Sequence, residues 1–165
     1  MCPKIAIYPG TFDPITNGHL DLIKRALQFF DKIILAIGEN PAKKPLFSID
    51  ERVFMAKKAL EELQLSHRVE VESFSGLLVE FAKKKGACVI IRGLRAVSDF
   101  EYEMQLALMN RKLSNSIDTI FLMPSLRYIF LSSSIIKEAA QFGGQVDDLV
   151  PKIVADKLKE KFGPC

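Results

Sequence analysis

The chain has 165 residues, of which 48% are hydrophobic and 26% charged, and its formal net charge is +3. This length suits a single domain over residues 1–165, and the ordinary globular composition excludes general disorder. The basic excess is too small to indicate nucleic-acid binding. Three scattered cysteines without a C-x-x-C pair argue against a disulfide scaffold and predict a reducing, cytoplasmic setting. We expect no signal peptide and no membrane contact, because every apolar run is far shorter than the roughly 18 residues that span a bilayer.

Short apolar runs rich in β-branched residues alternate along the chain with longer amphipathic stretches. The runs predict strands at 5–8, 32–37, 68–71, 87–91 and 119–123. The stretches predict helices near 18–30, 49–63, 76–85, 99–112, 133–142 and 150–161. This alternation predicts an α/β fold: a doubly wound, Rossmann-like parallel sheet of five strands with helices on both faces.

Two helix starts and one cysteine allow more local predictions. Ser48 with Glu51, and Ser98 with Glu101, have the S-x-x-E spacing of a capping box. Cys88 falls inside the fourth predicted strand, where we expect a buried and unreactive thiol.

Ligands of a doubly wound sheet bind beyond the carboxyl ends of its strands, so the loops after the five predicted strands are the candidate site. The first loop lacks the G-x-G-x-x-G pattern of dinucleotide-binding proteins. His19 falls in the first turn of the helix that follows, where exposed N–H groups and the positive end of the helix dipole favour a phosphate. By position alone, a histidine packed against the sheet is the commoner situation.

The other loops also carry residues suited to anions. Arg92 and Arg95 follow a buried strand three residues apart, so both guanidinium groups can reach one cleft and bind phosphate; two solvated arginines are the alternative. Glu103, on the next helix, is a candidate for an adenosine contact or an ion pair. Three serines at 132–134 open a helix and can offer hydroxyl and N–H groups to phosphate, or one of them can simply cap the helix.

Four strings of the sequence resemble the bacterial phosphopantetheine adenylyltransferase family of the nucleotidyltransferase superfamily. They are G-T-F-D-P-I-T-N-G-H (10–19), N-P-A-K-K-P (40–45), I-R-G-L-R with D-F-E-Y-E-M-Q (91–95 and 99–105), and L-S-S-S (131–134). Thr16 stands where many members of the superfamily have the first histidine of H-x-G-H, and the adenylyltransferase group itself has T-N-G-H there. Leu131 stands where isoleucine is common, which is a conservative departure.

The resemblance implies transfer of AMP from ATP to 4′-phosphopantetheine, which gives dephospho-coenzyme A and pyrophosphate in coenzyme A biosynthesis. It implies that His19 stabilises the transition state, and that Thr11, Lys43, Leu78 and Arg92 bind the acceptor. The ATP site that it implies consists of Thr11, Phe12, His19, Gly93, Leu94, Arg95, Glu103, Tyr128, Ile129, Phe130, Leu131, Ser132, Ser133 and Ser134. It also implies Mg²⁺ held mainly by phosphates and water rather than by protein ligands, a homohexamer, and coenzyme A as a feedback ligand.

Three other functions remain open at this stage. A different nucleotidyltransferase could use CTP or nicotinate mononucleotide, although the strings at 40–45 and 91–95 weigh against it. A module could bind ATP without turnover, although His19 with Lys43 and Arg92 argues against that. A nucleic-acid binder would require a strongly salt-dependent DNA affinity.

Overall fold

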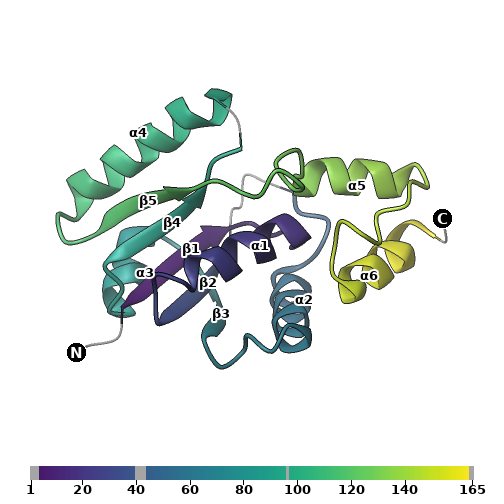
Figure 1. Ribbon diagram of the computed structural model, residues 1–165, viewed down its shortest axis with the longest axis horizontal. Coiled ribbons are helices and arrows are strands. Elements are labelled where there is room, and N and C mark those ends of the chain that lie inside the picture. Colours follow the sequence, from purple (N-terminus) through teal and green to yellow (C-terminus); the bar gives the residue numbers. More distant parts are fainter. Residues whose placement is uncertain (1–3, 40–43, 96, 164–165) are drawn as a thin grey trace.

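The computed structural model describes residues 4–39, 44–95 and 97–163 (Figure 1). The strands are β1 (Ile5–Gly10), β2 (Lys32–Gly38), β3 (Val69–Phe74), β4 (Val89–Gly93) and β5 (Asp118–Leu122). They pair in parallel in the order β3-β2-β1-β4-β5, which confirms the predicted doubly wound sheet. Because the order reverses at β1, the switch point lies between β1 and β4, where such folds bind ligands.

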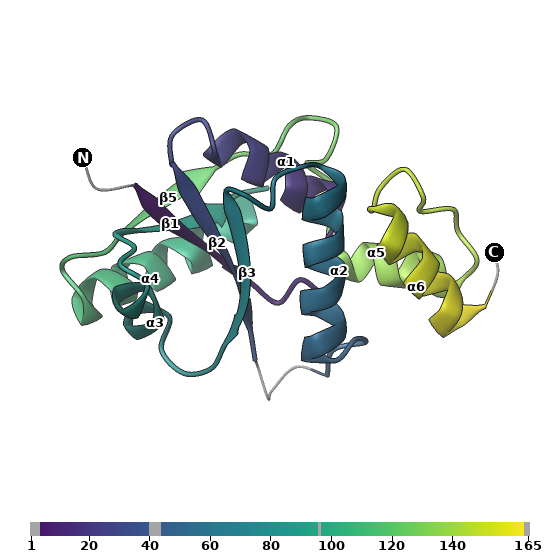
Figure 2. The same cartoon turned by 90° about the horizontal axis from the view of Figure 1, so that it is seen from below.

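The helices of the described residues are α1 (Asn17–Ala26), α2 (Ile49–Glu62), α3 (Leu78–Lys84), α4 (Val97–Leu113), α5 (Ser133–Gln141) and α6 (Lys152–Phe162). In both ribbon views, α5 and α6 lie together at the end of the molecule that is remote from the N-terminus (Figures 1 and 2). None of the described helices combines the length and apolar character that crossing a membrane requires.

The strands divide the interior into two cores because their side chains alternate between the faces of the sheet. Ile33, Leu35 and Ile37 of β2 enter the larger core, which α1, α2, α5 and α6 cover. Ile34 and Ala36 enter the smaller core with residues of α3. This is why β2 is apolar on both sides, as a parallel strand between two helical layers must be.

Several predicted boundaries are wrong by one to four residues, and two of these errors change an inference. β4 begins at Val89, so Cys88 lies before the strand and is exposed rather than buried. Helix α4 begins at Val97, so Ser98 lies inside the helix and is not its N-cap. The other predicted capping box is confirmed: Ser48 Oγ accepts from the Glu51 N–H, and the Glu51 carboxylate accepts from the Ser48 N–H at 2.8 Å.

The C-terminal part of the chain closes over the start of α1. The backbone N–H of Asn17 donates to the Leu149 carbonyl at 3.0 Å, and its side-chain amide donates to the Asp148 carbonyl at 3.0 Å. The first turn of α1 is therefore held by a segment more than a hundred residues away along the chain.

Candidate active site at the switch point of the sheet

A cleft of about 840 Å³ opens at the carboxyl ends of the strands, at the switch point. Segments that follow all five strands contribute to its walls, as the fold class predicts. The cleft brings together most of the residues that the sequence singled out. They are Thr11, Phe12, His19, Leu78, Arg92, Gly93, Arg95, Glu103, Tyr128, Leu131, Ser132, Ser133 and Ser134.

The loop after β1 is folded tightly against the base of the cleft. Phe12 has a φ of +46°, in a region that side chains seldom adopt, and its ring meets the His19 ring edge to face at 5.0 Å between centroids. A Cβ on Gly10 would lie 2.8 Å from the Phe12 ring, so only glycine fits there without a shift. Arg52, which is buried, donates to the Thr11 carbonyl at 2.8 Å and to the Phe47 carbonyl at 3.2 Å. These contacts fix the backbone around Thr11.

The His19 ring is oriented by the residue that caps its own helix. Thr16 is the N-cap of α1: its Oγ1 accepts from the His19 backbone N–H, and its own backbone N–H donates to His19 Nδ1 at 3.0 Å. This is a capping box with histidine in the place usually taken by Glu or Gln. Because Nδ1 accepts a hydrogen bond, the neutral ring carries its proton on Nε2, so Nε2 is a hydrogen-bond donor.

Burial keeps this imidazole neutral. Desolvation, reinforced by the positive charge of Arg95, lowers the pKa of His19 to about 4. Burial likewise raises the pKa of the Tyr8 hydroxyl, which lies close by on β1. At neutral pH the site therefore presents a neutral N–H donor among cationic arginines.

The two arginines occupy different places in the cleft. Arg92 forms a two-point ion pair with Glu103 of α4, with its Nε at 2.6 Å, and its Nη1 donates to the Pro9 carbonyl at 3.2 Å. Although burial alone would lower it, the contact with Glu103 raises the pKa of Arg92, so this guanidinium stays charged. Arg95 donates to the Leu131 carbonyl at 2.9 Å and reaches the segment before α5. Glu103 is thus the ion-pair partner that the sequence offered as one of two possibilities.

Of the three serines at the start of α5, two form hydrogen bonds within the chain and the third is exposed in the cleft. Ser132 is the N-cap and its Oγ accepts from the Ile135 N–H at 3.1 Å. The hydroxyl of Ser133 donates to the Pro14 carbonyl at 2.8 Å. Ser134 lines the cleft and is exposed. The first N–H groups of α5 and its positive dipole end face the same cleft, which suits an anion.

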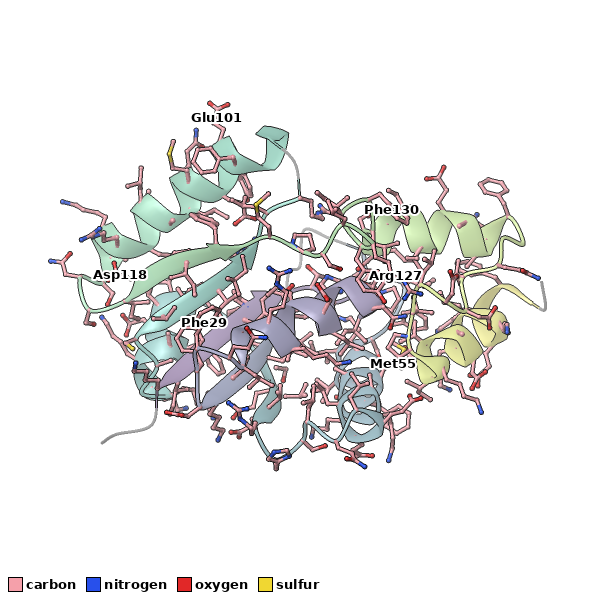
Figure 3. All side chains as sticks on the ribbon, viewed as in Figure 1. Phe29, Met55, Glu101, Asp118, Arg127 and Phe130 are labelled. Atoms are coloured by element: carbon pink, nitrogen blue, oxygen red, sulfur yellow. The ribbon has the colours of Figure 1, made fainter. Side chains whose placement is uncertain are left out.

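Four predicted site residues are not among the residues that line the cleft. Lys43 is outside the described residues, and its neighbour Lys44 lines the cleft. Leu94, Ile129 and Phe130 do not line the cleft, and the Phe130 side chain is largely exposed (Figure 3).

Sequence reasoning missed the polar residues that support the walls. Asp13 is buried and forms an ion pair with Lys137 of α5 at 2.6 Å, and both line the cleft. Arg52 was missed as well. The available signal for Asp13 was its position between Phe12 and Pro14 in a loop that follows a buried strand; Lys137 and Arg52 carry no local signal.

The carboxylates of the cleft do not form a metal cage. Within the described ranges, no group of three or more His, Cys, Asp or Glu residues could hold a metal ion. Asp13 and Glu103 are already engaged with Lys137 and Arg92. Glu39 is the third carboxylate that lines the cleft, and the described residues offer no group of three ligands for a protein-bound metal.

Comparison with known proteins shows the family of the chain. Residues 7–139 match the cytidylyltransferase-like family. A phosphopantetheine adenylyltransferase from Desulfosudis oleivorans is 58% identical over 97% of this chain and 94% of its own length. Another from Caldanaerobacter subterraneus subsp. tengcongensis is 57% identical over 96% of this chain and 98% of its own length. The chain therefore belongs to the cytidylyltransferase-like family and, within it, to the phosphopantetheine adenylyltransferases.

A solved structure supports the fold separately. A Vibrio parahaemolyticus protein assigned as a nicotinate-nucleotide adenylyltransferase superimposes with a TM-score of 0.69 over 99% of this chain and 97% of its own. Its sequence identity is 15%, so this likeness concerns the fold alone.

Proposed function

We propose that this chain transfers AMP from ATP to 4′-phosphopantetheine, with dephospho-coenzyme A and pyrophosphate as products. The observation that carries the proposal is the His19 capping box, which directs a neutral Nε2–H donor into a cleft between Arg92, Arg95 and the N-terminus of α5. Relatives named phosphopantetheine adenylyltransferase, which are 57–58% identical over nearly the whole chain, support the same substrates.

The reaction is an in-line displacement at the α-phosphorus of ATP. A phosphate oxygen of the acceptor forms a bond to that phosphorus, and the bond to the bridging oxygen of pyrophosphate breaks. The acceptor phosphate is already largely ionised near pH 7, so no strong base is required. Catalysis then depends on positioning and on stabilising charge on the phosphoryl oxygens.

His19 is suited to stabilising charge on the phosphoryl oxygens. A histidine with a pKa of about 4 is not a proton acceptor of useful strength at neutral pH, but its Nε2–H can donate to an oxygen on which negative charge develops. We place it against the α-phosphoryl group, with Arg95 and the start of α5 at the leaving pyrophosphate.

The acceptor side combines Thr11, Arg92, Lys43 and Leu78. Thr11 and Arg92 both line the cleft at the switch point, where Arg92 Nη1 donates to the Pro9 carbonyl. Leu78, at the start of α3, lies on the cleft wall in reach of the pantetheine arm of a bound acceptor. We retain Lys43 as a phosphate ligand by its resemblance to the family.

Three further parts of the proposal concern what binds the chain. Mg²⁺ enters as part of the Mg-ATP substrate, held by phosphate oxygens and water. Coenzyme A, which shares the chemistry of the product, occupies the same cleft as a feedback ligand. The assembly is a homohexamer, which the apolar surface of α4 supports.

Pyrophosphate release from ATP, measured with and without 4′-phosphopantetheine, tests the proposed function. We expect release that depends on the acceptor. Release that instead depends on nicotinate mononucleotide, or CTP use in place of ATP, would assign a different nucleotidyltransferase. ATP binding without release under any acceptor would leave a binding module.

A further inference from the structure

Asp13 is a buried carboxylate on the cleft wall, 4% exposed, and the chemistry above assigns it no part. Its Oδ1 accepts from the Phe47 backbone N–H at 2.9 Å. Its Oδ2 accepts from the Leu46 backbone N–H at 2.9 Å and from Lys137 Nζ at 2.6 Å. One carboxylate thus receives three hydrogen bonds from two distant parts of the chain.

These two parts lie on opposite sides of the proposed reaction. Leu46 and Phe47 belong to the segment between β2 and α2 that directly follows the two lysines of the acceptor-side loop. Lys137 belongs to α5 and lies one turn after Ser133, at the pyrophosphate side. A second hydrogen bond joins the same two segments as the Asp13–Lys137 pair: Ser133 Oγ donates to the carbonyl of Pro14, the residue after Asp13.

An ion pair of this kind is a better constraint than a source of stability. Desolvation of a buried carboxylate and an ammonium offsets much of their attraction, so the pair adds little net stability. Its geometry is nevertheless demanding, because the carboxylate must stay where its charged and backbone donors meet. In-line transfer needs the attacking oxygen about 3–3.5 Å from phosphorus, and small displacements of either substrate are costly.

We propose that Asp13 is a positioning residue for phosphoryl transfer, which holds the acceptor-side segment 44–47 and helix α5 in a fixed mutual arrangement. Lys137 acts through it as the α5 end of this link. The inference rests on the proposed function for the identity of the two sides, whereas the link itself is a property of the chain. Each substrate alone should bind nearly normally without the link, and the transfer between them should suffer.

Four single variants and one double variant test this. Lys137→Met removes the ammonium at nearly constant length, Asp13→Asn removes the carboxylate charge, and Lys137→Arg keeps the pair. Lys157→Met is the matched control: it removes a lysine that pairs with Glu160 at 2.6 Å on α6, outside the cleft.

The first measurement combines the Kd of ATP and the Kd of 4′-phosphopantetheine, each from a separate calorimetric titration, with kcat from pyrophosphate release. We expect kcat to fall by roughly 10- to 100-fold in Lys137→Met and Asp13→Asn, with each Kd within about threefold of wild type. Lys137→Arg should recover most of the loss. Asp13→Asn combined with Lys137→Met should be no worse than Asp13→Asn alone, because both changes break the same link.

Amide hydrogen exchange provides a second measurement that needs no turnover. The N–H groups of Leu46 and Phe47 should exchange several-fold faster in Lys137→Met and remain unchanged in Lys157→Met. A wild-type chain that releases no pyrophosphate would defeat the proposed function, and the exchange comparison would still decide the link. The positioning role is overturned if amide exchange at Leu46 and Phe47 is unchanged, or if folded variants keep the wild-type kcat. It is also overturned if Lys137→Met binds ATP tenfold more weakly with a normal kcat, because Lys137 would then be a direct phosphate ligand.

Discussion

The two walls of the cleft differ in how completely one chain supports them. On the β1–α1 side, Asp13 and Thr16 are buried and bonded within the chain, and α1 packs Leu20, Leu22 and Ile23 into the larger core. On the β4–α4 side, no residue from Phe100 to Leu113 is buried. Large apolar side chains of α4 are open to solvent, among them Leu108 and Met109, and Glu101 extends away from the sheet (Figure 3).

The difference separates two kinds of function in one site. The group assigned to the chemistry, His19, is on the wall that a single chain fixes. The acceptor-side Arg92 pairs with Glu103 on the helix that a single chain leaves uncovered. We therefore expect changes on the first wall to alter catalysis without altering assembly, and changes on the second to alter stability and assembly together with substrate use.

The largest effect is expected at His19 on the first wall. His19→Ala should lower kcat by roughly 10²–10³, or about 3–4 kcal/mol, because a donor to developing charge is lost. It should also lower the free energy of unfolding by about 1 kcal/mol, because the Thr16 N–H loses its acceptor. His19→Glu restores an acceptor but not a donor, so it should regain stability and stay inactive. Near-normal kcat in folded His19→Ala would remove the catalytic assignment.

Arg92→Ala tests the second wall. It removes a phosphate ligand and leaves Glu103 unpaired in a largely buried position. We expect at least tenfold weaker use of 4′-phosphopantetheine and a loss of about 2–3 kcal/mol in urea unfolding. The stability loss should be smaller in the double variant with Glu103→Gln. A weaker affinity for ATP with a normal affinity for the acceptor would reverse the two subsites.

The uncovered helix gives the next prediction. Leu108→Glu places a charge on the exposed apolar surface of α4 and should lower the molar mass in light scattering at micromolar concentration, since charges are disfavoured in the core of an interface. Lys112→Glu, an exposed position on the same helix, is the control and should leave the mass unchanged. A monomeric mass for the wild-type chain would contradict the proposed hexamer and leave the apolar surface of α4 without an explanation.

Low pH should lower the stability of the protein through protonation of His19 on the β1–α1 wall. The folded pKa of about 4 lies below the ordinary 6.5, so the unfolded chain binds the proton more readily between these values. Stability contributed by the neutral ring is therefore present above pH 6.5 and is lost as the pH falls toward 4. Because the ring is partly open to the cleft, we expect a loss of about 1–3 kcal/mol. Urea titrations at several pH values should show this slope in wild type and a shallower one in His19→Ala.

The smallest effect is expected at Cys88. The thiol is exposed before β4 and remote from the proposed chemistry, so Cys88→Ser should change stability by less than about 0.5 kcal/mol and leave kcat unchanged. A trapped adenylyl-cysteine adduct would contradict direct transfer.

The sequence predicts the parts of this molecule that repeat a local pattern. Apolar runs identify the strands, and the carboxyl ends of those strands locate the cleft, whereas the position of His19 alone does not distinguish a site residue from a packed histidine. Boundaries fail where tertiary packing decides them, as at Cys88 and at the start of α4. The Asp13–Lys137 pair joins residues 124 positions apart. No local pattern distinguishes such a lysine from one on a solvated surface.

The bonds from Asn17 to the carbonyls of Asp148 and Leu149 have a consequence for synthesis. A growing chain leaves the ribosome from its N-terminus, at about 5–20 residues per second, and its early segments begin to fold first. The loop that will hold the reacting phosphates is translated several seconds before its anchors at Lys137 and Leu149, which lie more than a hundred residues further along the chain. The nascent chain thus has all five strands of its sheet for some seconds while the site is still unfinished, so catalytic competence is delayed until residues well beyond β5 have been translated.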